Sequence, residues 1–150
     1  MATWQVQLIT QKTVKLCWEA CARMMWKWRY KNLNDYSAKA GNYLKLDKGL
    51  DENEMDVFYN KLGLRSLQSP KSANVIWALK WTPVILTDVN QDTGHAVVAS
   101  GFEKNSFTLA NPCATLSLDF DGGADSCVAG VVKVKADVLG AKLGKFIWYW

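Results

Sequence analysis

The feature that most constrains the fold is a change of periodicity near Pro83. Before it, apolar residues recur at helical spacing. After it, the chain consists of short β-branched and aromatic runs separated by turn sequences such as Lys104-Asn105. Because the strands follow the helices instead of alternating with them, the sheet is predicted to be antiparallel. The sequence therefore predicts an α+β fold, with a helical half at about 1–80 and a β half at about 81–150.

Helices are expected in four segments, at about 16–30, 35–46, 51–62 and 70–80. The third segment has the strongest end signals, since Asp51 and Glu54 have capping-box spacing and Gly63 suits the helix end. In the fourth segment, Ser69 is expected to cap the helix and Pro70 to take its first position.

Strands are expected at about 83–89, 95–102, 106–110, 115–120, 128–134 and 146–150. The chain has 150 residues and contains no repeat, low-complexity tract or convincing linker. This length is sufficient for one hydrophobic core without help from metals or disulfides. We therefore expect residues 1–150 to form a single domain.

Charge and hydropathy narrow the range of partners. The formal charge of +4 comes from 18 basic and 14 acidic residues spread along the chain, so no nucleic-acid partner is expected. There is no signal peptide and no run of eighteen apolar residues, so neither signal-dependent export nor membrane insertion is expected. Eight tryptophans are too many to bury completely, and some are expected to line a cleft or a partner surface.

The four cysteines do not form a metal pattern. They lie at positions 17, 21, 113 and 127, without paired CxxC spacing, and the chain has one histidine. We therefore expect no metal and no cofactor. A bridge between Cys17 and Cys21 is geometrically poor on a helix. A disulfide between Cys113 and Cys127 stays open as an alternative for an oxidising compartment.

Cys17 is the candidate nucleophile. It falls in the first turn of the first predicted helix, where free backbone N–H groups and the helix dipole favour a thiolate. A cysteine nucleophile needs an imidazole to take its proton. Because His95 is the only histidine, it must be that base if Cys17 is catalytic. The alternatives are a cysteine that only packs in the core and a histidine that only ends a strand.

The spacing around these two residues resembles that of papain-like cysteine peptidases. Gln11 lies six positions before Cys17, Trp18 follows the cysteine, and Asn111 lies sixteen positions after His95. With 78 positions from Cys17 to His95, the chain is similar to the compact branch of the family. That branch includes bacteriocin leader peptidases, papain-like effectors of plant-pathogenic bacteria and papain-like domains of interbacterial toxins.

This resemblance implies a papain-like fold with the active site in the cleft between the two halves. It implies that the side chain of Gln11 and the backbone N–H of Cys17 form the oxyanion hole. His95 would hold the thiolate as an ion pair and later protonate the leaving amine, while Asn111 would orient the imidazole. The chain departs from the family where many compact members have Asp in place of Asn111, and where Pro112 replaces the tryptophan of the large enzymes.

Two further residues adjoin the proposed catalytic groups. Trp18 and Gly94 are candidate substrate-binding residues, with packing beneath the site as the alternative for Trp18. The leading function is a cysteine endopeptidase that acts through an acyl-thioester. The resemblance further implies a bacterial toxin effector that acts on a protein substrate in the cytoplasm of a target cell, with a cognate immunity protein covering the cleft.

Two other functions remain open. A transglutaminase or glutamine deamidase toxin would use the same Cys-His-Asn chemistry on a side-chain amide. A catalytically idle peptide-binding module would keep the cleft without the reaction.

Overall fold

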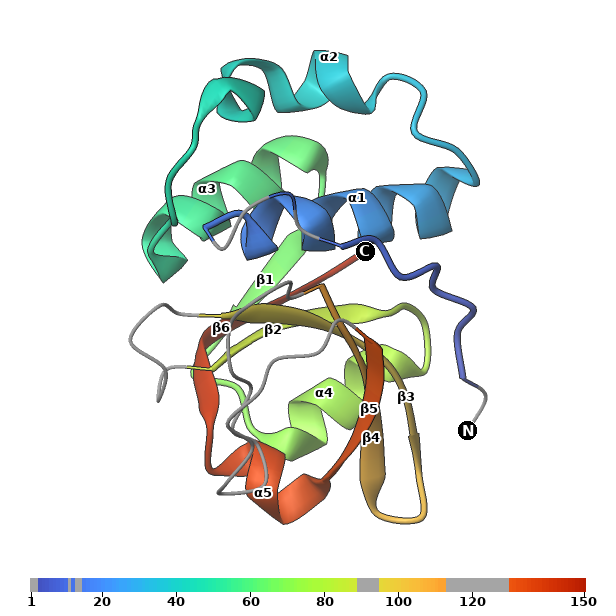
Figure 1. The fold of residues 1–150 in the computed structure, drawn as a ribbon. Coiled ribbons are helices and arrows are strands. Elements are labelled where there is room, and N and C mark those ends of the chain that lie inside the picture. Colours follow the sequence, from blue (N-terminus) through green and yellow to red (C-terminus); the bar gives the residue numbers. More distant parts are fainter. Residues whose placement is uncertain (1–2, 11, 13–14, 89–94, 113–129) are drawn as a thin grey trace.

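The structure is a computed structural model that describes residues 3–10, 12, 15–88, 95–112 and 130–150. Within these residues, helices cover a six-stranded antiparallel sheet with the strand order β1-β6-β2-β3-β4-β5 (Figure 1). The predicted α+β class is therefore confirmed.

The first three helices form a layer on one side of the sheet. Their bounds are α1 (Cys17–Tyr30), α2 (Tyr36–Ala40) and α3 (Glu52–Leu62), with the 3-10 helix η1 (Gly41–Lys45) between α2 and α3. The capping box of α3 is confirmed, since the Glu54 backbone N–H donates to Asp51 Oδ1 and the Asp51 N–H donates to Glu54 Oε1. Gly63 ends α3 with φ +102°, a conformation that favours glycine.

The fourth predicted helix begins later than expected. Helix α4 (Ser72–Leu79) is preceded by Lys71, whose backbone N–H donates to Asn74 Oδ1 at 2.8 Å. Ser69 does not cap this helix, because it has φ +51° and its N–H donates to the Lys145 carbonyl. The contact with a distant strand decided this boundary, and no local pattern indicates it.

The sheet contains β1 (Arg65–Gln68), β2 (Val84–Asp88), β3 (Ala96–Glu103), β4 (Ser106–Asn111), β5 (Gly130–Lys135) and β6 (Leu143–Tyr149). The predicted strand at 115–120 lies outside the described residues. Strand β1 and the short helix α5 (Ala136–Gly140) were not expected. Both β1 and α4 precede residue 81 yet pack with the sheet, so the layer of α1 to α3 ends before residue 65.

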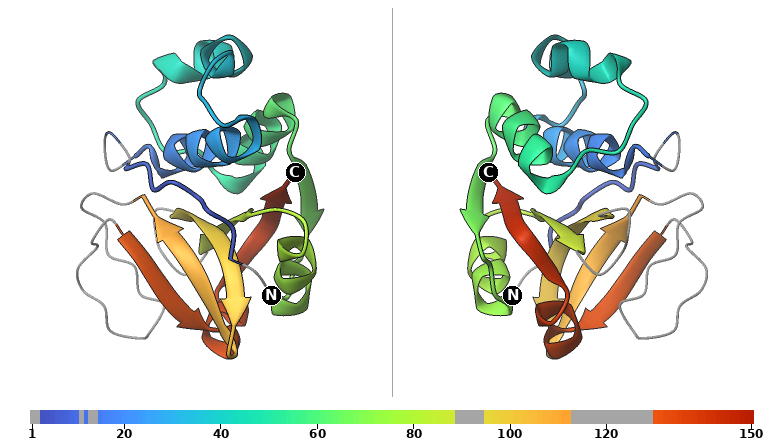
Figure 2. Two further views of the ribbon diagram at one scale, coloured as in Figure 1. Left: turned by 90° about the vertical axis from the view of Figure 1, so that its right-hand side faces the viewer. Right: turned by 90° about the vertical axis from the view of Figure 1, so that its left-hand side faces the viewer.

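Both faces of the sheet are buried, and each belongs to a different core. Because side chains alternate along a strand, Ile85 of β2 packs against α1 and α3, whereas Val84 and Leu86 pack against α4. We call the first cluster the helical-side core and the second the α4-side core. Figure 2 shows the layer of α1 to α3 at one end of the sheet, with α4 and β1 along one outer edge.

Candidate active site

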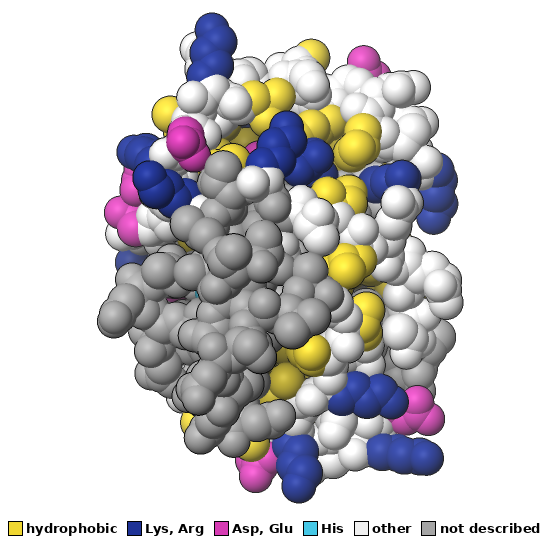
Figure 3. Space-filling view, viewed as in Figure 1, with side chains coloured by type: hydrophobic (Ala, Val, Ile, Leu, Met, Phe, Trp, Pro, Cys, Tyr) yellow, Lys and Arg dark blue, Asp and Glu magenta, His cyan; other side chains and the backbone are white. Residues whose placement is uncertain are grey.

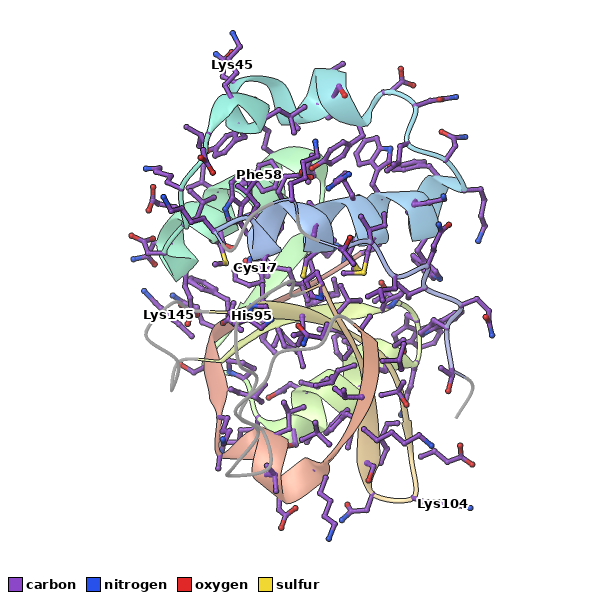
Figure 4. The ribbon with its side chains drawn as sticks, in the orientation of Figure 1. Cys17, Lys45, Phe58, His95, Lys104 and Lys145 are labelled. Atoms are coloured by element: carbon purple, nitrogen blue, oxygen red, sulfur yellow. The ribbon has the colours of Figure 1, made fainter. Side chains whose placement is uncertain are left out.

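Cys17 is the first residue of α1 and faces β3. Its side chain is buried, and the backbone N–H groups of Ala96, Trp18 and Cys17 itself are near enough to its sulfur to lower its pKa. Since Ala96 directly follows His95, this contact brings the thiol to the start of the strand that carries the histidine. Figure 4 shows Cys17 and His95 as neighbours across the boundary between α1 and the sheet.

Burial controls the protonation of this thiol. Desolvation raises the pKa of Cys17 above its ordinary value, and the three backbone N–H groups lower it by less. The sequence predicted a lowered pKa from the helix N-terminus, and this prediction is wrong for the structure described. Cys21, one turn further along α1, is fully buried and burial raises its pKa still more.

His95 and Asn111 form a buried pair. The distance from His95 Nε2 to Asn111 Oδ1 is 2.6 Å, and both side chains are almost completely inaccessible to solvent. An amide oxygen can only accept, so Nε2 carries the proton and Nδ1 keeps its lone pair. Within the described part of the chain, Nδ1 has no hydrogen-bond partner. The pair therefore leaves one ring nitrogen in the form of a base.

A hairpin explains why sixteen positions separate the two residues. Strands β3 and β4 pair in antiparallel register, and Lys104 and Asn105 join them with φ of +52° and +61°. Positive φ at both turn residues matches the twist of a tight hairpin, which the sequence predicted at this place. The hairpin brings His95 and Asn111 back to the same end of the two strands.

Burial also shapes the titration of the imidazole. Desolvation lowers the pKa of His95 below its ordinary value, and the hydrogen bond with Asn111 opposes this shift in part. Burial therefore favours the neutral thiol of Cys17 and the neutral imidazole of His95, and it opposes the ion pair that the sequence predicted.

The other predicted site residues have different outcomes. Gln11 and Gly94 lie outside the described residues, as do Cys113 and Cys127. Trp18 is completely buried, with its indole N–H donating to the Lys48 carbonyl at 3.0 Å and its ring edge-on to Phe58. A peptide cannot contact this ring. Trp18 therefore packs in the core, which was the alternative to a substrate-binding role.

A buried ionic group close to Cys17 was missed by the sequence interpretation. Glu19 is 5% exposed and accepts from Arg23 Nε at 2.7 Å and from the Tyr36 hydroxyl at 2.9 Å. Burial and the Glu19 carboxylate raise the pKa of Tyr36 far above its usual range. The network ties α2 to the first turns of α1. Its only signal in the sequence is the i, i+4 spacing of glutamate and arginine.

Among the residues that the structure describes, no group of three histidine, cysteine or acidic side chains is placed to hold a metal ion. No helix in the described part is both long and apolar enough to cross a membrane.

A comparison with protein-family models matches residues 2–118 to the family described as papain-like cysteine protease AvrRpt2. The chain belongs to this family. It is therefore a papain-like cysteine protease, as the motif spacing predicted. A search of curated proteins found no match.

Solved structures similar to this papain-like protease include three peptidases. The first is a double glycine motif protease from an AMS/PCAT transporter, solved with a leader peptide (TM-score 0.63, 15% identity, covering 99% of this chain and 94% of that one). The second is the peptidase domain of Streptococcus ComA (TM-score 0.65, 14% identity, covering 96% of each chain). The third is a putative C39-like peptidase from Bacillus anthracis (TM-score 0.59, 14% identity, covering 97% of this chain and 94% of that one). These likenesses confirm the predicted papain-like fold.

Proposed function

We propose that the protein is a cysteine endopeptidase in which Cys17 is the nucleophile and His95 is the general base. The observation that carries this proposal is the 2.6 Å pair of His95 Nε2 and Asn111 Oδ1, which leaves Nδ1 as an acceptor. The effect of the Ala96 backbone N–H on the Cys17 thiol supports the pairing, because Ala96 directly follows His95.

The reaction follows from these positions. Nδ1 of His95 takes the thiol proton while the sulfur of Cys17 attacks the scissile carbonyl carbon. Donors to the resulting oxyanion are the Cys17 backbone N–H and, by resemblance to the family, the side chain of Gln11. Collapse breaks the C–N bond, and the amine leaves with the proton from Nδ1. Water, deprotonated by His95, then hydrolyses the thioester and restores the thiol.

Asn111 acts through His95 in this scheme. Its oxygen holds the Nε2 proton, so it fixes both the tautomer and the plane of the imidazole. A neutral amide does this without adding a charge to a buried site. The same hydrogen bond becomes stronger once the ring is protonated, because the donor is then charged.

The biological role that we infer is that of a bacterial toxin effector. The enzyme would act in the cytoplasm of a target cell and cleave a protein there. A cognate immunity protein that covers the cleft would protect the producing cell. Membership of a family named for AvrRpt2, together with the motif resemblance to interbacterial toxin domains, supports this role.

The chemistry is tested by a comparison of cellular N-termini. Cells that express the intact protein should contain new peptide N-termini that are missing from cells expressing Cys17→Ala. Cys21→Ala is the matched control, since Cys21 lies one turn further along α1 and is also buried. Glutamine side chains that gain about one mass unit, without new N-termini, would instead identify a deamidase.

Two simpler measurements test the nucleophile and the toxin role separately. A papain-type peptidyl epoxide should label Cys17 ahead of the other three cysteines, and equal labelling of all four would rule out an activated nucleophile. Expression should arrest growth for the intact protein and not for Cys17→Ala. A Cys17→Ala protein that still kills would exclude a proteolytic mechanism of toxicity.

A further inference from the structure

Two of the eight tryptophans have no place inside the fold. Five indole N–H groups donate hydrogen bonds to protein acceptors, namely those of Trp4, Trp18, Trp26, Trp148 and Trp150. By contrast, Trp77 is 51% exposed and Trp81 is 68% exposed, and neither indole has a hydrogen-bond partner in the described part of the chain. These are large apolar rings with a free polar edge, held at the surface.

Both rings lie at the C-terminal end of α4. Trp77 is in the last turn of α4, Trp81 lies two residues beyond the end of this helix, and the exposed Lys80 lies between them in the sequence. The ring of Trp77 is 5.9 Å from that of Tyr149, edge-on, and Tyr149 pairs in register with Arg65 of the edge strand β1. Arg65 is exposed as well, so a second cation lies opposite the Tyr149 that Trp77 contacts.

The segment that carries both indoles has charge of one sign. Residues 77–81 contain Lys80 and no acidic residue. The acidic Asp137 of α5 belongs to the other end of α4, where the Ser72 hydroxyl donates to the Ala136 carbonyl at 2.9 Å. Elsewhere charges are scattered, and Figure 3 shows lysine and arginine side chains distributed around the margin of one face.

We propose that Trp77, Trp81, Lys80 and Arg65 form a peripheral docking surface for an anionic phospholipid bilayer. An indole prefers the boundary between headgroups and acyl chains, where its ring is apolar and its N–H remains hydrated. An anionic bilayer attracts basic side chains near its surface, and Lys80 precedes Trp81 while Arg65 lies opposite the Tyr149 that Trp77 contacts. Two rings exposed by more than half at a helix end match a planar surface better than a concave protein site.

The position of this surface leaves the candidate active site free. Helix α4 packs on the face of the sheet opposite to the one covered by α1, where Cys17 lies. Figure 2 shows α4 and β1 along one outer edge of the molecule, with β5 at the opposite edge. An enzyme held to a bilayer through α4 would still present the Cys17 side to a substrate, so this inference does not depend on the proposed function.

Co-sedimentation with vesicles tests the proposal. The protein should bind vesicles of mixed phosphatidylcholine and phosphatidylglycerol, bind phosphatidylcholine alone much more weakly, and dissociate at high salt. The double variant Trp77→Ala/Trp81→Ala should bind at least about tenfold more weakly, since each buried ring contributes more than 1 kcal/mol. The pair Lys80→Gln/Arg65→Gln should lose most of the salt dependence.

The control is Val131→Ala, because Val131 is 63% exposed on the opposite edge strand β5. This variant should bind as the parent protein does, and circular dichroism checks that all variants are folded. The proposal is overturned if the parent protein does not bind anionic vesicles, or if the double tryptophan variant binds them equally well. A surface that instead recognises a soluble protein would give the first of these results.

Discussion

The two faces of the sheet are packed with different kinds of side chain. The α4-side core is aliphatic apart from Phe107, and its buried members are Val75, Ala78, Leu79, Val84, Leu86, Val97, Ala99, Phe107, Leu109, Val134, Leu139 and Ile147. The helical-side core contains seven large aromatic residues, which are Trp18, Trp26, Tyr36, Phe58, Tyr59, Phe146 and Trp148. It also contains Cys17.

The two cores differ in whether directed hydrogen bonds fix the positions of the elements packed in them. Aliphatic side chains bury area without direction, so the α4-side core can hold the sheet but cannot orient a reacting group. On the helical side, polar atoms on the rings make directed contacts. The Tyr59 hydroxyl donates to the Trp18 carbonyl at 2.8 Å, and Trp148 Nε1 donates to Asp56 Oδ1 at 2.8 Å. These bonds fix α1 and α3 relative to the sheet, and therefore the thiol relative to the imidazole.

The largest expected effect is on the chemistry that the helical side carries. Replacing Cys17 with serine should lower kcat/KM by about 10⁴-fold or more, because a hydroxyl is a poor nucleophile beside a base tuned for a thiol. Cleavage of a peptide taken from the substrate measures this. Cys21→Ser serves as the control and should retain activity wherever it is folded. Equal losses for both variants would contradict a specific role for the Cys17 sulfur.

A second test compares adjacent residues on opposite faces. Ile85→Ala and Leu86→Ala should each lower the free energy of unfolding by about 2 to 5 kcal/mol, because both side chains are fully buried. Urea denaturation measures this loss. Only Ile85→Ala opens a void in the core that holds Cys17, so only it should also lower kcat/KM in the folded protein. If Leu86→Ala lowers activity as much, the two faces do not have separate roles.

A third test concerns the link from α3 to β6. Glu52 Oε2 accepts the backbone N–H of Lys145 at 2.5 Å and that of Phe146 at 3.1 Å. Glu52→Ala should therefore lower the free energy of unfolding by about 1 to 3 kcal/mol. The neighbouring Asn53 accepts only the exposed Lys145 ammonium, so Asn53→Ala should cost less than about 0.5 kcal/mol. Thermal unfolding of the two variants compares these losses. Equal losses would contradict a stabilising link from Glu52 of α3 to β6.

The smallest effects are expected from pH. The pKa of His95 is lowered in the fold, so the unfolded chain binds its proton first, and stability should fall as pH drops below about 6.5. The pKa values of Cys17 and Cys21 are raised, so the unfolded chain loses their protons first, and stability should fall as pH rises above 9.0. Urea midpoints measured across this range should show both declines.

Variants assign each decline to its residue. His95→Gln should reduce the loss of stability on the acid side, and Cys21→Ala should reduce it on the alkaline side. A His95→Gln protein with an unchanged acid decline would show that other groups cause it.

Local signals in the sequence were sufficient for much of this molecule. The capping box and terminal glycine predicted α3, the Lys104-Asn105 turn predicted the β3–β4 hairpin, and the interval from His95 to Asn111 predicted a pair that the structure brings to hydrogen-bonding distance. Each of these depends on neighbours in sequence or on two strands joined by one tight turn. Short-range geometry is encoded directly in residue type and spacing.

Other features depend on contacts that spacing does not reveal. The start of α4 depends on the hydrogen bond from Ser69 to Lys145, and β1 exists because it pairs with β6 at the far end of the chain. The sequence placed Cys17 at a helix N-terminus, which favours a thiolate. Tertiary packing then buried that thiol between α1 and the sheet and reversed the direction of its pKa shift. The loss of solvent raises the pKa by more than the backbone N–H groups lower it.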